Sequence, residues 1–208
     1  MVERRCPWMS KMGLAVLVLM VLAAFSASPA LADGMRFRLH FSYVSGLQDL
    51  ADAYEDAIEA VEPFTDVDST VFPVGISLFP YYQWDSGLFL GAGIGPFIYL
   101  WAEGDDDDFT HWQIPVSFNV GYVFGEDGPV SFYIRGGPSY HFADGDFHEG
   151  SNLGVTGAIG LEFFKSSHAA MGLEASFDSA EVDIETRPGH EEGVKATEFS
   201  AGLFVMFK

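Results

Sequence analysis

The sequence predicts an all-β fold, an eight-stranded antiparallel up-and-down β-barrel with a short helix in its first long connection. Three observations predict it: apolar and polar residues alternate along eight segments, short and long connections alternate between them, and charged residues in the segments keep to one parity. Side chains along a strand point to alternate faces, so each segment has one apolar and one polar face. The segments are residues 35–43, 72–82, 88–100, 112–124, 130–142, 153–163, 169–177 and 199–207.

The connections between the segments are of two kinds. Three are short and rich in turn-forming residues: 84–87, 125–129 and 165–168. The others are long and acidic: 46–70, 102–110, 143–152 and 178–196. Short turns at one end and long loops at the other are typical of an up-and-down barrel.

The first long connection contains a helical pattern. Between Gly46 and Glu62, apolar residues recur every three or four positions opposite acidic ones, and Pro63 follows. We expect a helix that ends before this proline. It has two interpretations, a lid that rests on the barrel mouth or a docking surface for a partner.

The charged residues indicate which face of the barrel points outward. Five within the segments, and one directly before the last segment, all lie on the polar parity: Arg36, Arg38, Arg135, Glu162, Glu174 and Glu198. A charge that faces lipid near the bilayer midplane costs about 2–4 kcal/mol, whereas a charge in the lumen can pair. We therefore expect a transmembrane barrel with its apolar face in lipid, because a water-soluble barrel has the opposite arrangement.

The lumen of such a barrel is expected to be filled. Eight strands leave an interior just wide enough for side chains, and bulky residues fall on the inward parity: Phe79, Phe89, Phe97, Tyr99 and Tyr133. We expect an ion-pair network among the inward charges Arg36, Arg38, Arg135, Glu162 and Glu174. A gated ion path along these residues is the alternative.

Prolines and a possible nucleophile also fall within the strands. Four prolines remove ladder donors, so we expect bulges or strand stretches above the membrane at Pro73, Pro96, Pro115 and Pro138.

Ser139 and His141 share one strand face and Asp144 follows, the residue types of a serine nucleophile. A hydrogen bond in the lumen wall is the favoured interpretation, so no catalytic residue is assigned.

The amino-terminal segment has the features of a signal peptide. Arg4, Arg5 and Lys11 precede an apolar run over 13–25, and Ala30-Leu31-Ala32 supplies a small-x-small cleavage pattern. About a dozen apolar residues are too few to span a bilayer as a helix. We expect a cleaved signal peptide at residues 1–32, which contains the only cysteine, and a transmembrane β-barrel domain at 33–208.

Charge and composition limit the partners. The chain has 208 residues with 10 Lys and Arg against 30 Asp and Glu, a net charge of −20, which excludes nucleic acid. Asp105, Asp106, Asp107 and Asp108 form a possible divalent-ion loop, although they lack the spacing of an EF-hand and a solvated loop is the alternative. No cofactor is predicted, and the six histidines show no metal-binding spacing.

The signal peptide, the eight amphipathic strands and a last strand 199–207 that ends in Phe207 carry a resemblance. The chain resembles the small bacterial outer-membrane β-barrels of the OmpA transmembrane-domain, OmpX and OmpW kind, over the whole mature chain. The resemblance implies a bacterial outer-membrane location with periplasmic short turns and extracellular acidic loops. It also implies that the barrel-insertion machinery reads Phe207, although Lys208 follows it where the family usually ends in Phe.

These observations together predict a non-enzymatic outer-membrane barrel with a structural or surface role and a mostly side-chain-filled lumen. Outer-membrane lipid, lipopolysaccharide and divalent cations at the acidic loops are the expected partners. One alternative is a narrow, porin-like channel for small or hydrophobic solutes. The other is a lipid A-modifying enzyme.

Overall fold

A computed structural model describes residues 34–61, 68–71, 74–103, 108–166, 168–187 and 190–208. The predicted signal peptide lies outside these residues, and residues 34–208 form one unit. Its elements are β1 (Met35–Ser45), α2 (Gln48–Val61), β2 (Asp68–Val71), β3 (Val74–Gln83), β4 (Leu88–Ile94), β5 (Ile98–Glu103), β6 (Asp108–Phe124), β7 (Ser131–Gly145), β8 (His148–Phe163), β9 (Ala169–Arg187) and β10 (His190–Phe207).

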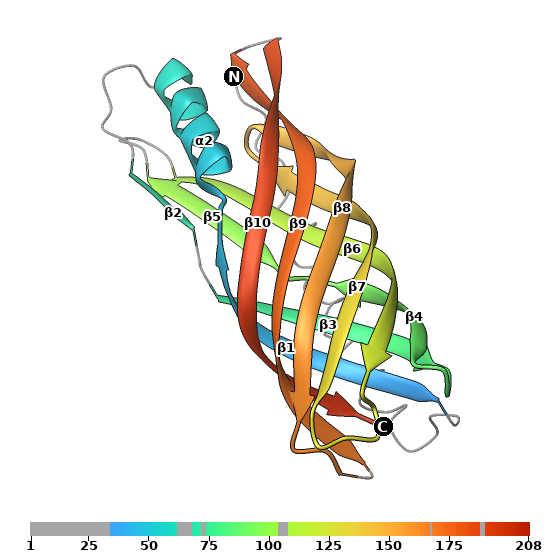
Figure 1. Ribbon diagram of the computed structural model, residues 1–208. Coiled ribbons are helices and arrows are strands. Elements are labelled where there is room, and N and C mark those ends of the chain that lie inside the picture. Colours follow the sequence, from blue (N-terminus) through green and yellow to red (C-terminus); the bar gives the residue numbers. More distant parts are fainter. Residues whose placement is uncertain (1–33, 62–67, 72–73, 104–107, 167, 188–189) are drawn as a thin grey trace. The chain divides into compact units, whose positions relative to one another are not determined.

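The strands close into an antiparallel barrel (Figure 1). β1 pairs with β10 on one side and β3 on the other, and β6 pairs with β7 to complete the ring. β2 with β3 and β4 with β5 are the two halves of interrupted strands, so the ring has the predicted eight. The helix in the first long connection is also confirmed. Among the described residues, no helix has the length and apolar character to cross a membrane.

The large apolar side chains of the exterior confirm the predicted orientation of the two faces. Phe118 is 52% exposed, Leu203 52% and Leu153 76%, and all three lie on the apolar parity. The opposite parity is buried, including Arg38 at 1% and Glu162 at 1%. A surface this apolar is stable in contact with hydrocarbon, so the outer wall is the lipid-facing one.

Two of the predicted loops are largely strand. The connections expected at 143–152 and 178–196 belong to long hairpins, β7–β8 and β9–β10. In β9 the inward residues change from polar to apolar at Val182 and Ile184, which are buried, while Glu181 and Asp183 are exposed. This pattern is that of a barrel wall in water, with acidic residues on the outside. The acidic residues that led us to predict loops here therefore lie largely on strands.

A bulge separates β4 from β5. Ile94 pairs with Val116 of β6 and Ile98 pairs with Gln113, so three residues of one strand lie opposite two of its partner. One extra residue reverses the parity that follows. Ile98 is therefore buried, whereas Phe97 is 40% exposed and Tyr99 half-buried. The prediction that Phe97 and Tyr99 point inward is wrong for this reason, and the predicted irregularity at Pro96 is present.

Helix α2 packs its apolar face against the inner wall of the barrel at the end where the long hairpins lie, here called the hairpin end. Leu50, Tyr54 and Ile58 are fully buried in a cluster with inward side chains of four strands: Val44, Ile98, Leu100, Val182, Ile184 and Ala196. The Tyr54 hydroxyl lies 3.0 Å from Nδ1 of His111 on β6. Burial raises the pKa of Tyr54 above its ordinary value. These contacts hold the helix against the inner wall at the hairpin end.

Candidate functional site in the barrel interior

The interior contains a layer of ion pairs in its membrane-spanning part. Arg38 of β1 donates to Glu162 of β8 at 3.0 Å and to Glu174 of β9 at 3.2 Å. Arg135 of β7 also donates to Glu174, at 2.8 Å, and its other Nη contacts Asn119 of β6 at 3.0 Å. Two arginines and two glutamates from four strands therefore form one network with balanced charge.

Aromatic rings enclose this network. The Arg38 guanidinium carbon lies 4.1 Å from the ring centre of Tyr133 and 4.4 Å from that of Phe204, and the Tyr133 hydroxyl donates to Glu174. Such cation–π contacts add to the ion pairs when water is excluded. Gly160 on β8 makes room for Tyr133, because a Cβ at this position would come within 2.3 Å of the ring. The charges and the rings therefore pack directly against one another inside the barrel.

Arg36, although predicted in the same network, lies elsewhere. It shares the inward face of Arg38 but is two residues nearer the end of the barrel at which the short turns lie, here called the turn end. There it pairs with Glu126 of the β6–β7 turn, which also accepts a 2.7 Å hydrogen bond from Gln83. The strand parity identified the face correctly, but the partner depends on height along the barrel.

A second polar cluster contains Ser139 and His141. The Ser139 hydroxyl donates to Asp178 of β9 at 2.8 Å, and His141 Nε2 lies 2.6 Å from the same carboxylate oxygen and 3.1 Å from the hydroxyl. Gln113 contacts the other ring nitrogen, Nδ1. A catalytic triad needs the carboxylate and the hydroxyl on opposite nitrogens, whereas here both meet Nε2. The carboxylate is also Asp178, not the Asp144 considered in the sequence.

Glu198 of β10 lies beside this cluster and faces inward. It is 2% exposed, directly opposite Asp178 in the strand ladder, and its Oε2 has no hydrogen-bond partner among the described residues. Both carboxylates line a cavity of about 20 Å³, room for about one water molecule. Arg135 borders the cavity but is committed to Glu174 and Asn119. The Glu198 carboxylate is therefore buried without a countercharge of its own.

We expect Glu198→Gln to stabilise the barrel by about 1–3 kcal/mol, because it replaces a buried carboxyl group that has no countercharge with an amide, which needs none and can donate to Asp178. Equilibrium urea unfolding in phospholipid vesicles measures the change. Glu181→Gln, an exposed position on β9, is the control and should leave the free energy of unfolding nearly unchanged. A loss of stability specific to Glu198→Gln would contradict the assignment of an unpaired carboxylate.

The remaining predicted site residues lie at the two ends of the barrel. Asp105, Asp106 and Asp107 are outside the described residues, and Asp108 begins β6. Phe207 ends β10, where it pairs with Phe37 of β1, the two rings 6.5 Å apart. Within the described part of the chain, no group of three His, Cys, Asp or Glu side chains could hold a metal ion.

Sequence reasoning missed Asp178, Gln113 and Asn119 as members of the interior clusters. Asp178 was placed in a loop, because the apolar pattern was taken to end at Phe177. The sequence did contain a signal for it: Asp178 lies four positions after Glu174, and alternate residues of a strand point to the same face. The uncharged residues gave no comparable signal, since an amide on an inward face is ordinary.

This closed barrel, with an apolar exterior and an interior of ion pairs and rings, is a transmembrane β-barrel of the outer-membrane class. The chain belongs to the outer membrane protein beta-barrel domain family, whose model matches residues 13–207. No curated protein sequence matches the chain.

Solved structures agree with this fold. Neisserial surface protein A is 13% identical with a TM-score of 0.50, over 85% of this chain and 97% of that one. OprG of Pseudomonas aeruginosa is also 13% identical with a TM-score of 0.50, over 83% and 95%. The outer-membrane enzyme PagL is 16% identical over 68% and 96%, with a TM-score of only 0.36. The first two support the eight-stranded fold and say nothing of the activity of this chain.

Proposed function

We propose that this protein is a non-enzymatic outer-membrane barrel with a structural or surface role, its lumen closed by its own side chains. One observation carries the proposal: Arg38, Arg135, Glu162 and Glu174 form a single network across the lumen, closely surrounded by aromatic rings. The cavity beside this layer has room for about one water molecule. Steady passage of hydrated ions needs a wider path.

Planar bilayer recording tests the proposal. The protein, inserted into a bilayer, should show no steady single-channel conductance. Tyr133→Ala removes a buried ring from the lumen while keeping all the charges, so we expect conductance events to become more frequent. Tyr140→Ala is the matched control on the same strand, because this side chain is 38% exposed on the outer face. Stable open levels in the unmodified protein would refute a closed lumen.

The two alternatives have weaker geometric support. For a lipid A-modifying enzyme, Ser139 and His141 are the natural candidates, but the shared Nε2 and the burial of both side chains do not favour nucleophilic attack. For a channel, the path would cross the Arg38 network and then the apolar cluster under helix α2. Unchanged lipid A after overexpression is the result we expect for a protein without this activity.

Export and assembly complete the proposal. We propose that residues 1–32 direct export and are removed, that the turn end is periplasmic and that the hairpin end faces outward. The barrel-insertion machinery then recognises the last strand through Phe207. The acidic outer side chains of the hairpin end, among them Asp49, Asp52 and Glu181, are suited to divalent ions shared with lipopolysaccharide phosphates.

A further inference from the structure

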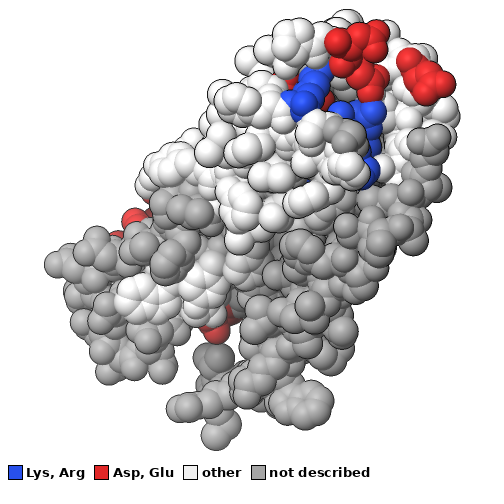
Figure 2. Space-filling model, turned by 90° about the horizontal axis from the view of Figure 1, so that it is seen from below, with Lys and Arg blue, Asp and Glu red and all other residues white. Residues whose placement is uncertain are grey.

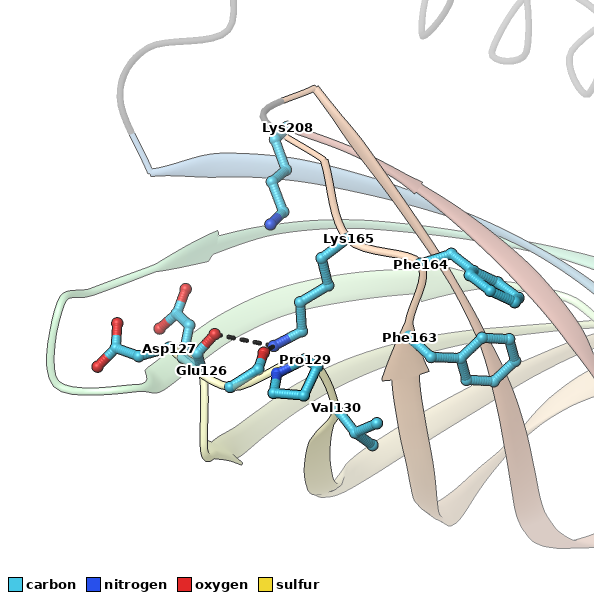
Figure 3. Close-up of a pocket in the computed structure, with 9 residues that line it drawn as sticks. Glu126, Asp127, Pro129, Val130, Phe163, Phe164, Lys165 and Lys208 are labelled. Carbon is cyan, nitrogen blue, oxygen red and sulfur yellow. Dashed lines mark hydrogen bonds between the residues drawn. The ribbon is translucent and has the colours of Figure 1, made fainter.

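The turn end carries an open hollow of about 640 Å³ (Figure 3). The β6–β7 turn forms one wall, and the β8–β9 turn together with Lys208 forms the other. The backbone N–H of Lys208 donates to the carbonyl of His168 at 2.9 Å, which fixes the end of β10 beside the β8–β9 turn. A hollow of this volume is the usual size for a site that binds a small molecule or a headgroup.

Charged side chains of both signs line the hollow. Lys165 donates to the backbone carbonyls of Glu126 and Gly128 at 2.8 and 2.9 Å, so its ammonium is held at the floor. Lys208 extends toward the same space, and Asp127, which is exposed, lies beside Glu126 at the edge of the hollow (Figure 3). Figure 2, which looks onto the turn end, shows basic and acidic side chains next to one another there.

Apolar side chains from both turns also line the hollow. Phe164 is 78% exposed and adopts a φ of 51°, and Val130 is 52% exposed. A bulky residue in the left-handed region is uncommon, and such backbone strain is often found at ligand-binding surfaces. Exposed aromatic side chains surround the barrel at this end: Tyr82, Trp84, Tyr122, Phe124 and Phe132. Aromatic girdles mark the membrane interface, so the hollow lies at headgroup depth.

We propose that this hollow binds the headgroup of one zwitterionic glycerophospholipid with a primary ammonium, such as phosphatidylethanolamine. The phosphate accepts from Lys208 and Lys165, the ammonium donates to Asp127, and the acyl chains extend along Phe164 and Val130. The site is independent of whether the lumen is closed, and so goes beyond the proposed function.

The charge pattern selects this lipid over its relatives. A purely anionic headgroup would meet the lysines but would also approach the carboxylates of Glu126 and Asp127. A choline headgroup has no N–H to donate to Asp127. Partial burial, with Arg36 and Lys165 nearby, lowers the pKa of Lys208, and a bound phosphate relieves this crowding of positive charge.

Competitive lipid retention tests the site. The folded protein is equilibrated in detergent with equal amounts of phosphatidylethanolamine, phosphatidylglycerol and phosphatidylcholine, and the lipids retained are counted by native mass spectrometry. We expect one tightly held phosphatidylethanolamine for each chain. Lys208→Ala and Asp127→Asn should each lower its retention about fivefold, equivalent to about 1 kcal/mol.

Two matched controls separate the site from general lipid contact. Lys195→Ala removes an exposed lysine near the hairpin end, and Asp85→Asn an exposed aspartate of the β3–β4 turn, and both should retain the lipid as the unmodified protein does. Equal retention of all three lipids, preference for phosphatidylglycerol, or equal losses in the controls and the site variants would each overturn the proposal.

Discussion

Arg38→Ala is expected to lower the free energy of unfolding by about 3–5 kcal/mol, the cost of removing one partner of a buried ion pair. Arg38 is 1% exposed and is held by both Glu162 and Glu174. Its removal leaves Glu162 without its arginine, and leaves Arg135 as the arginine that still pairs with Glu174. Urea unfolding in lipid vesicles, followed by tryptophan fluorescence, measures the loss.

Arg36→Ala is the matched control for this prediction. The two arginines lie on the same strand and the same face, but the Arg36 side chain is 14% exposed and its partner Glu126 is 33% exposed. Pairs that water can reach contribute about 0–1 kcal/mol. A similar loss in both variants would mean that the location of Arg38 within the network has no energetic consequence. Glu162→Gln in the Arg38→Ala background should recover part of the stability, because it removes the carboxylate left unpaired.

The fold was predictable because lipid and lumen impose opposite polarities on alternate residues. That rule identified the outer face through residues such as Phe118 and Leu203, and the inner face through Arg38 and Glu162. The rule failed outside the membrane, where lipid no longer contacts the outer face. Above the membrane the outside is water, so Val182 turns inward and Glu181 outward while the strand continues. A pattern read only for membrane strands places such residues in loops.

The second limit is the bulge between β4 and β5. Alternation gives correct faces only while the register is unbroken, and one added residue moves every later side chain to the other face. Pro96 indicated an irregularity, but no sequence feature gave the number of residues in it. Phe97 and Tyr99 were therefore assigned to the lumen, which Ile98 and Leu100 occupy instead.

The interior clusters were predictable in composition more than in pairing. Inward charges in a narrow barrel must find partners, so a network of Arg38, Arg135, Glu162 and Glu174 follows from strand parity and burial. The choice of partners depends on strand stagger, which the sequence does not state. Arg36 shows the consequence, since a difference of two residues on one face changes its partner to a turn residue, Glu126.

Leu203→Arg is expected to cost about 2–4 kcal/mol, because it places a charge on the outer wall near the bilayer midplane. Leu203 is 52% exposed and lies four positions before Phe207, the aromatic residue at the turn end of β10. At about 3.3 Å for each residue of a tilted strand, its height above that girdle is roughly 10 Å. The apolar band of such barrels is about 25 Å tall, so this height is close to its middle.

Leu153→Arg supplies a depth control with the same substitution. Leu153 is 76% exposed on β8 but lies ten positions before Phe163, roughly 25 Å above the girdle and near the opposite interface. An arginine there costs about 0–1 kcal/mol. Unfolding in vesicles should therefore separate the two variants by about 1–4 kcal/mol. Equal costs at both positions would mean that the cost of the arginine does not depend on its depth in the bilayer. The assignment of the apolar face to lipid would then be wrong.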